Sequence, residues 1–165
     1  MLRPLSNQKK YEAFYSGDPA VIQLPEGLKD KARIKAQKER AKKIERARET
    51  GDWSEVLVNG ETPTRFSMRP IPTAHYGELA LRLESARTVE DLYPIYLLAF
   101  CIALVDVYPL PEDVSVARIK HPKYGDIATT DFLDEAQCGG ELGAAIIFEL
   151  GHLAVERARE VSPKS

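Results

Sequence analysis

The last apolar segment of the chain carries the residues with the clearest metal-binding spacing. Glu149 and His152 form an E-x-x-H pair, a pattern that supplies two ligands on one helix face in di-metal helix bundles. Such a site needs a second pair and two more inward carboxylates, and the other histidines, His75 and His121, lie in no comparable setting. We therefore expect His152 to be a hydrogen-bonded or solvent-facing histidine, and we expect no metal.

The remaining reactive side chains have ordinary structural explanations. Cys101 and Cys138 lack both metal-ligand spacing and a disulfide-rich context, so we expect two structural or free thiols. The acids within 131–135 lie where a helix is predicted to begin, and the helix dipole favours negative charge there. The sequence has no glycine-rich phosphate loop, no nucleophile in a recognisable setting and no zinc spacing. These patterns argue against an enzyme and against a bound cofactor.

Positive charge is concentrated in one segment of the chain. Residues 29–48 hold ten Lys/Arg against three acids, whereas the whole chain has a net charge of −2. Ten cations over twenty residues could neutralise several phosphates, but the segment has no interleaved aromatic residues and the rest of the chain is net acidic. A solvated or protein-binding helix is the more economical interpretation, with nucleic acid as the alternative. The same helix could also clamp an acidic face of its own chain or of a neighbour.

The chain divides by composition into three parts. With 165 residues, 44% of them hydrophobic, it is long enough for one domain with a core and extra segments. Residues 1–27 form a proline-containing arm without regular periodicity, residues 28–50 are strong helix formers, and residues 51–165 hold the longest apolar runs. The N-terminus has no apolar run of the signal-peptide type, so we expect neither secretion nor a membrane anchor.

An uncharged run over residues 92–105 marks the centre of the predicted core. It is too short to span a bilayer, and Thr88 has the residue type of an N-cap with acids directly after it, so we predict a buried helix over 88–107. Pro94 predicts either a later start or a kink. An amphipathic helix over 141–161 has an apolar face wide enough to lie along the buried one.

A β-hairpin is predicted between the basic helix and the core. Segments 55–58 and 64–69 alternate apolar and polar residues, and Asn59-Gly60 between them is a two-residue turn signal. The sequence further predicts helices over 73–85 and 131–137, and a long loop with a short strand over 112–130. The predicted fold class is mainly α: a small helical domain with one β-hairpin, preceded by a basic helix and an extended N-terminal arm.

The stretch around the second predicted strand resembles a known family. Thr64, Phe66, Met68, Arg69, Pro70 and Ile71, followed by an apolar helix, a late D-F-L-D stretch and an amphipathic helix, are similar to the small tail assembly chaperones of long-tailed bacteriophages. The resemblance covers residues 50–161 and concerns layout as much as motif. It implies a non-enzymatic protein of the host cytoplasm that binds the tape-measure protein and promotes tail-tube assembly. The arm and the basic helix depart from the smallest members, which leaves open a structural subunit of a phage head or tail.

The partner-binding surface is predicted to lie before Pro72, because the two long apolar helices should bury each other's faces. The predicted contact residues come from the arm, the basic helix and the second predicted strand: Phe14, Tyr15, Val21, Ile22, Lys35, Lys38, Arg40, Lys42, Lys43, Phe66, Met68 and Arg69. The resemblance implies tape-measure and tail-tube proteins as partners. Nucleic acid bound through residues 29–48 is the alternative, self-association is left open, and no membrane partner is expected.

Overall fold

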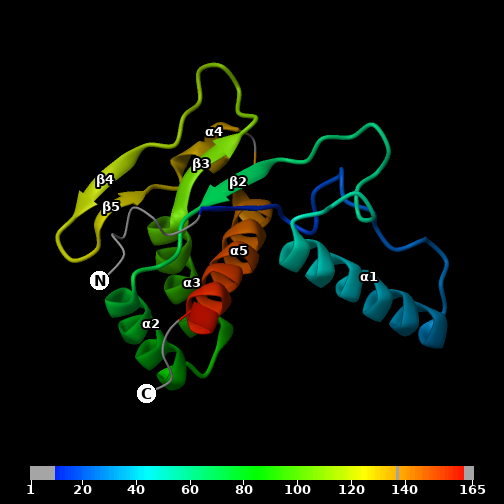
Figure 1. Ribbon diagram of the computed structural model, residues 1–165, viewed down its shortest axis with the longest axis horizontal. Helices are drawn as coiled ribbons and strands as arrows, with labels where there is room; N and C mark the ends of the chain where they lie inside the picture. The colour runs from blue at the N-terminus through cyan, green and yellow to red at the C-terminus, as the bar shows by residue number, and fades with distance from the viewer. Residues whose placement is uncertain (1–9, 137, 162–165) are drawn as a thin grey trace. The chain divides into compact units, whose positions relative to one another are not determined.

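The computed structural model describes residues 10–136 and 138–161, and the described chain is mainly α, as predicted (Figure 1). The elements in chain order are β1 (Tyr11–Ala13), α1 (Asp30–Thr50), β2 (Arg65–Met68), α2 (Thr73–Ser85), α3 (Val89–Ala103), β3 (Leu104–Tyr108), β4 (Arg118–His121), β5 (Gly125–Ala128), α4 (Asp131–Glu135) and α5 (Gly140–Val161). Among the described helices, none combines the length and the apolar character that crossing a membrane would require.

The described chain forms two compact units, each with its own core. Of the described residues, 13–65 make up the smaller unit, and 66–136, 138–161 and 10–12 make up the larger one. The predicted boundaries, after residues 27 and 50, differ from this division. Apolar side chains before and after α1 pack on that helix, so the arm, the basic helix and the following segment belong to the same unit.

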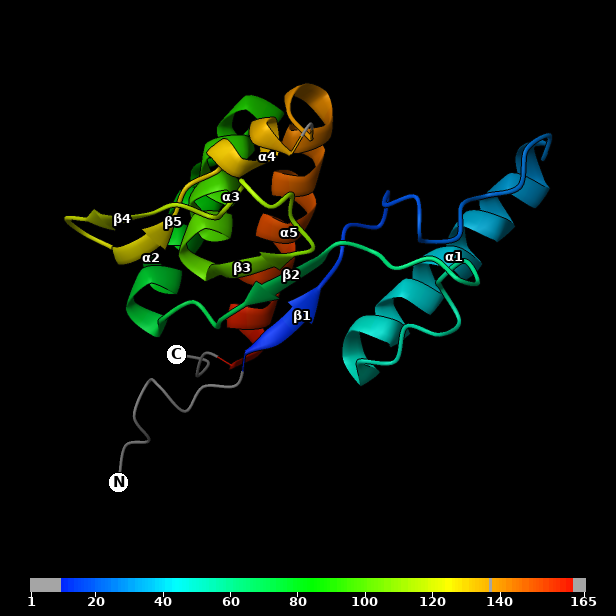
Figure 2. The same cartoon turned by 90° about the horizontal axis from the view of Figure 1, so that it is seen from above.

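Helices α3 and α5 form the centre of the larger unit, where they lie side by side (Figures 1 and 2). At their close approach, a Cβ atom added to Gly151 of α5 would overlap the backbone of Tyr96 in α3, so the contact requires glycine. Thr88 and Asp91 form a capping box at the start of α3, in which each side chain accepts a hydrogen bond from the other's backbone N–H. The helix therefore begins where the sequence predicts, and Pro94 lies inside it.

The C-terminal end of α3 differs from the prediction. The helix ends at Ala103, and the next five residues form β3 instead of a last helical turn. Val105 and Val107 are β-branched and alternate with Asp106, which favours a strand. β3 is an edge of a three-stranded sheet with the order β1-β2-β3.

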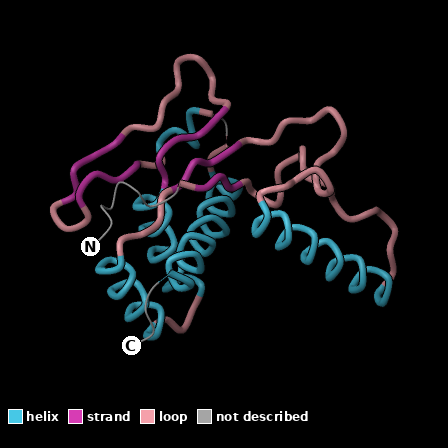
Figure 3. Tube along the Cα trace, in the orientation of Figure 1, coloured by secondary structure: helices cyan, strands magenta, loops and turns pink. Residues whose placement is uncertain are grey.

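The hairpin predicted between segments 55–58 and 64–69 does not form, and the chain between α1 and β2 is loop (Figure 3). Gly60 still makes a turn, with φ of 82°. The segment before it pairs with the arm, through an isolated bridge between Leu57 and Val21. Segment 64–69 instead contributes β2, the central strand of the sheet in the larger unit. The arm has no strand periodicity in its sequence. The hairpin prediction therefore does not consider the arm as the pairing partner of the segment before Gly60.

Within the smaller unit, apolar side chains from before and after α1 pack on the C-terminal half of that helix. The buried core of this unit consists of Phe14, Val21, Ile44, Ala47, Trp53 and Val56, with Ile22 and Leu57 packed against them. Of these, α1 supplies Ile44 and Ala47, so one short face of the helix provides its buried apolar contact. Gly51 ends α1 in the left-handed conformation and donates its N–H to the Ala47 carbonyl at 2.8 Å.

Strands β4 and β5 form an antiparallel hairpin where the sequence predicts a loop with one short strand. Ile119 lies opposite Ile127, and His121 lies opposite Gly125. The connection begins with Pro122 and ends at Gly125, whose φ is 74°. A short loop of this kind places glycine in the left-handed region. Of the proline and glycine that argue against one continuous strand, Pro122 begins the turn and Gly125 is the first residue of the second strand.

Candidate partner-binding surface

His152, the histidine of the E-x-x-H pair in α5, takes part in an aromatic contact with Tyr96. His152 Nδ1 lies 3.2 Å from the Tyr96 hydroxyl, and the two rings meet edge to face with centroids 5.4 Å apart. Phe148 packs edge-on against the same tyrosine, with centroids 4.9 Å apart. His152 is thus hydrogen-bonded, as predicted. The described residues contain no group of three or more side chains that could hold a metal ion.

The two thiols lie in different environments. Cys101 is buried in α3, and burial raises the pKa of its thiol to about 11. It is therefore protonated at neutral pH and a poor nucleophile. Cys138 is partly exposed, and its Sγ lies 3.5 Å from the Ala136 carbonyl oxygen. Both are free cysteines, as the sequence predicts.

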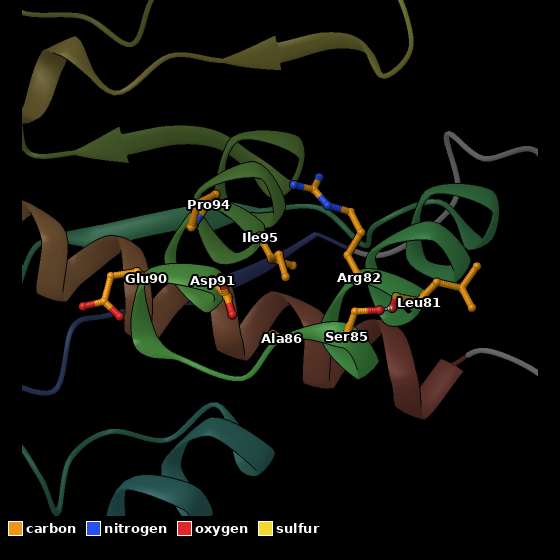
Figure 4. Close-up of a pocket in the computed structure, with 8 residues that line it drawn as sticks. All are labelled: Leu81, Arg82, Ser85, Ala86, Glu90, Asp91, Pro94 and Ile95. Carbon is orange, nitrogen blue, oxygen red and sulfur yellow. Dashed lines mark hydrogen bonds between the residues drawn. The ribbon is translucent and has the colours of Figure 1, made fainter.

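An open groove of about 590 Å³ lies between the last turns of α2 and the first turns of α3 (Figure 4). The Asp91 carboxylate in this groove accepts hydrogen bonds from the backbone of Arg87 and Thr88, which hold its pKa below the usual range. Figure 4 shows the Arg82 guanidinium and the Asp91 carboxylate pointing in different directions. These two charged groups do not converge on one position, as a small-ligand site would require.

Two arginines join the C-terminal end of α3 to the β4–β5 hairpin. Arg69 donates from Nε to the Ile102 carbonyl at 3.0 Å, and Arg118 donates from Nη1 to the Leu104 carbonyl at 2.9 Å. Both guanidinium groups also donate to the backbone carbonyl of Asp126, and Arg118 forms an ion pair with its carboxylate at 3.2 Å. Burial and the neighbouring Arg118 lower the pKa of Arg69, against the opposite effect of Asp126. Arg69, predicted to contact a partner, is thus engaged within the fold.

Four other predicted contact residues are buried. Phe14 and Val21 are 3% and 1% exposed in the smaller unit, while Phe66 and Met68 are 2% and 0% exposed in the larger one. The prediction that these side chains form an exposed surface is corrected by their burial. The apolar side chains of the arm and of β2 are buried in the cores of the two units. A partner could reach them only through local unfolding.

Arg40 of α1 also has a structural role. It donates from Nε to the Ile22 carbonyl at 2.8 Å and from Nη2 to the Ser16 carbonyl at 2.5 Å. Tyr15 and Ile22, two further predicted contact residues, are half-buried in the same segment. Arg40 therefore fixes the arm to α1 and is not an exposed cation.

The exposed lysines of α1 form a row along one face. Lys31, Lys35, Lys38 and Lys42, called here the lysine row, are four, three and four residues apart, a spacing that places side chains on one side of an α-helix. At 100° per residue the centre of the row lies about 180° around the helix from the buried Ile44 and Ala47. All four lysines are exposed, and none forms an ion pair with a residue that the structure describes.

Uncharged residues lie beside the lysine row. Ile34, Gln37 and Ala41, called here the uncharged ridge, are three and four residues apart, and all three are exposed. Ile34 has 53% of its surface exposed, although it is a large apolar side chain. The sequence-based list of contacts includes neither these residues nor Lys31. Their 3–4 spacing is visible in the sequence, but the sequence does not say which face of α1 the arm covers.

Comparison with known proteins identifies no relative of this chain. No protein-family model, curated protein or solved structure matches the chain. The candidate surface therefore rests on the chain's own geometry. Of the predicted contact residues, Lys35, Lys38, Lys42 and Lys43 lie exposed on α1, and the first three lie in one row with Lys31.

Proposed function

We propose that the protein is a non-enzymatic assembly factor that works by binding another protein, and that this partner belongs to a bacteriophage tail. In this proposal it acts in the host cytoplasm as a tail assembly chaperone, which binds the tape-measure protein while tail-tube subunits assemble around it. The observation that carries the protein-binding part is the exposed face of α1. Its lysine row offers charge to a partner, and its uncharged ridge offers the apolar surface of Ile34.

The phage assignment is supported by the sequence, namely by the stretch from Thr64 to Ile71 and the order of the helices after it. In the fold, this stretch contains β2, whose Phe66 and Met68 belong to the core. It also contains Arg69, which bonds to the end of α3. The stretch therefore has a structural role, and a resemblance there concerns the architecture of the larger unit more than its contact surface.

Co-expression tests the proposal. The tagged full chain is produced together with the tape-measure protein encoded in the same genome, and with the tail-tube protein in a parallel experiment. We expect the tape-measure protein to co-purify, and we expect purified particles to lack the chain by mass spectrometry. Stoichiometric amounts in the particles would identify a structural subunit of the head or tail instead. Absence of complexes with both tail proteins would overturn the proposal.

A further inference from the structure

We infer that α1 binds an acidic amphipathic helix of a partner protein, which lies along the uncharged ridge and faces the lysine row with its carboxylates. This inference rests on the proposed function and deepens it, because it names the contact surface and the chemistry of the partner. Both features lie on the N-terminal two-thirds of α1, where the arm covers no residue completely.

The uncharged ridge has the spacing that helix packing requires. Residues three and four apart form a continuous ridge on a helix, which a second helix can pack against at about 8–10 Å between axes. Ile34 is the one large apolar anchor of the ridge, and the small side chain of Ala41 leaves room for a close approach two turns later. A bound helix would remove the exposed surface of Ile34 from water, as amphipathic helices do when they dock through anchors at this spacing.

Gln37 lies between these two residues and limits the strength of the contact. The spacing of Ile34, Gln37 and Ala41 is that of the a, d and next a positions of a heptad, and a polar residue at a core position lowers the stability of a helix pair. The Gln37 amide carries no charge, so it repels neither an acidic helix nor the lysine row. The ridge therefore suits a reversible complex better than a permanent one.

The charges define both the sign of the partner and the length of the contact. From Lys31 to Lys42 the row spans roughly 16 Å, at 1.5 Å per residue. Beyond Lys42 the same face continues with Glu45 and Glu49, which are also exposed. An acidic helix is therefore attracted over about three turns and repelled after them. A contact of this length, with a single large anchor, again points to a weak complex.

Nucleic acid fits this face less well than an acidic helix does. Arginine is the side chain best suited to phosphate because its planar group binds two oxygens at once, and the row contains only lysines. Arg40 is engaged with the arm, and Arg46 lies 3.8 Å from Glu55. Arg33 is exposed, but it lies roughly 140–180° around the helix from the lysines of the row. Phosphates also gain nothing from the exposed Ile34.

A second copy of the chain offers no matching surface among the described residues. The other exposed large apolar side chains lie singly on different segments: Val58, Leu81, Val89, Tyr108, Ile119 and Leu142. None of these segments combines several such residues with acids at helical spacing. Self-association through the uncharged ridge is therefore disfavoured.

The test uses two fluorescent heptad peptides of equal length, with Leu at the core positions and either Glu or Lys at the flanking positions. We expect the full-length protein to bind the Glu peptide with micromolar affinity, at least tenfold tighter than the Lys peptide, and more weakly as salt increases. Ile34→Gln should weaken binding of the Glu peptide about tenfold without changing any charge. The double variant K31E/K38E should reverse the preference, so that the Lys peptide binds better.

Lys43→Glu is the matched control, because Lys43 is exposed on α1 but lies about 120–140° around the helix from Lys31 and Lys38. It should leave both affinities within twofold, and circular dichroism should show every variant folded. Equal binding of the two peptides would overturn the inference. Binding of duplex DNA that depends on the lysine row but not on Ile34 would do the same, since it would identify a phosphate surface. So would self-association, measured by sedimentation, that Ile34→Gln abolishes.

The two proposals fail separately. If the Glu peptide binds as expected but the tape-measure protein does not co-purify, the proposed function fails and the helix-binding surface stands. If the tape-measure protein co-purifies equally well with the wild type and with Ile34→Gln, the function stands and the inferred surface is wrong.

Discussion

At the scale of single residues, Gly151 is the position where sequence and packing are most tightly linked. Gly151→Ala should destabilise the protein by about 2 kcal/mol, because the new Cβ would overlap the Tyr96 backbone and force α3 and α5 apart. Gly77→Ala is the control, since Gly77 lies inside α2 with no atom near the added Cβ. That change should stabilise the protein by about 0.5–1 kcal/mol through helix propensity. Urea unfolding followed by circular dichroism measures both, and equal effects would contradict the close helix contact.

The two cysteines should differ in reactivity. With a pKa of about 11, the buried Cys101 thiol stays protonated at pH 8, so a disulfide reagent should label it only after unfolding, whereas partly exposed Cys138 should react in the native protein. Cys138→Ser should remove the native reaction.

The buried Cys101 thiol should also make the stability of the protein depend on pH. In the unfolded chain this thiol loses its proton at the ordinary pKa of 9.0, whereas in the folded protein it keeps its proton up to a pKa of about 11. Its contribution to the free energy of unfolding is therefore present below pH 9 and lost as the pH rises towards 11.

At the scale of elements, Arg69 and Arg118 replace the usual glycine cap at the end of α3. Arg69→Lys should cost about 1–2 kcal/mol, because an ammonium group cannot reproduce the two separate bonds to the Ile102 and Asp126 carbonyls. Arg82→Lys, an exposed change on α2, should alter stability by less than about 0.5 kcal/mol. Thermal unfolding compares the two variants. A loss of similar size in both would show that the Arg69 bonds do not stabilise the fold.

The helices are the part of the fold that the sequence predicts well. Their signals are local: Thr88 with Asp91 for the start of α3, Gly51 for the end of α1, and an apolar face for α5. The strands are predicted poorly because their pairing depends on distant segments. Segment 64–69 alternates correctly for a strand, but its neighbours β1 and β3 come from the arm and from the end of an apolar helix.

The candidate surface is partly readable from the sequence for the same reason. A count of charges identifies α1 as the basic element, and three of the predicted lysines lie in the exposed row. The count does not separate these from Arg40, whose role depends on where the arm passes. Nor does apolar character separate Ile34, which is exposed, from Ile44, which is 5% exposed. The position of the arm on α1 determines which of these residues are covered and which are exposed.

At the scale of the whole molecule, the chain buries its apolar residues in two separate cores, and the arm belongs to both units. Tyr11 lies in β1 of the larger unit, where the Arg157 guanidinium stacks 4.4 Å from its ring centroid. Phe14, three residues later, contacts Trp53 in the smaller unit. Removing residues 1–50 would therefore take away β1 and four of the six buried residues of the smaller core, namely Phe14, Val21, Ile44 and Ala47. The segment before α1 therefore contributes buried contacts to both units and is not a dispensable arm.

The two cores should unfold at different denaturant concentrations. The smaller unit, of roughly 50 residues, is in the size range where a single apolar core is marginal, and it contains Trp53, the one tryptophan of the sequence. In urea, Trp53 fluorescence should therefore change at a lower concentration than far-UV circular dichroism, to which α2, α3 and α5 of the larger unit contribute most. Val21→Ala should lower the urea concentration of the fluorescence transition alone, and Leu79→Ala should lower mainly that of the dichroism transition. Each change removes about 2 kcal/mol or more of buried contact from one unit. Coincident transitions in the wild type and in both variants would show that the units unfold as one cooperative structure.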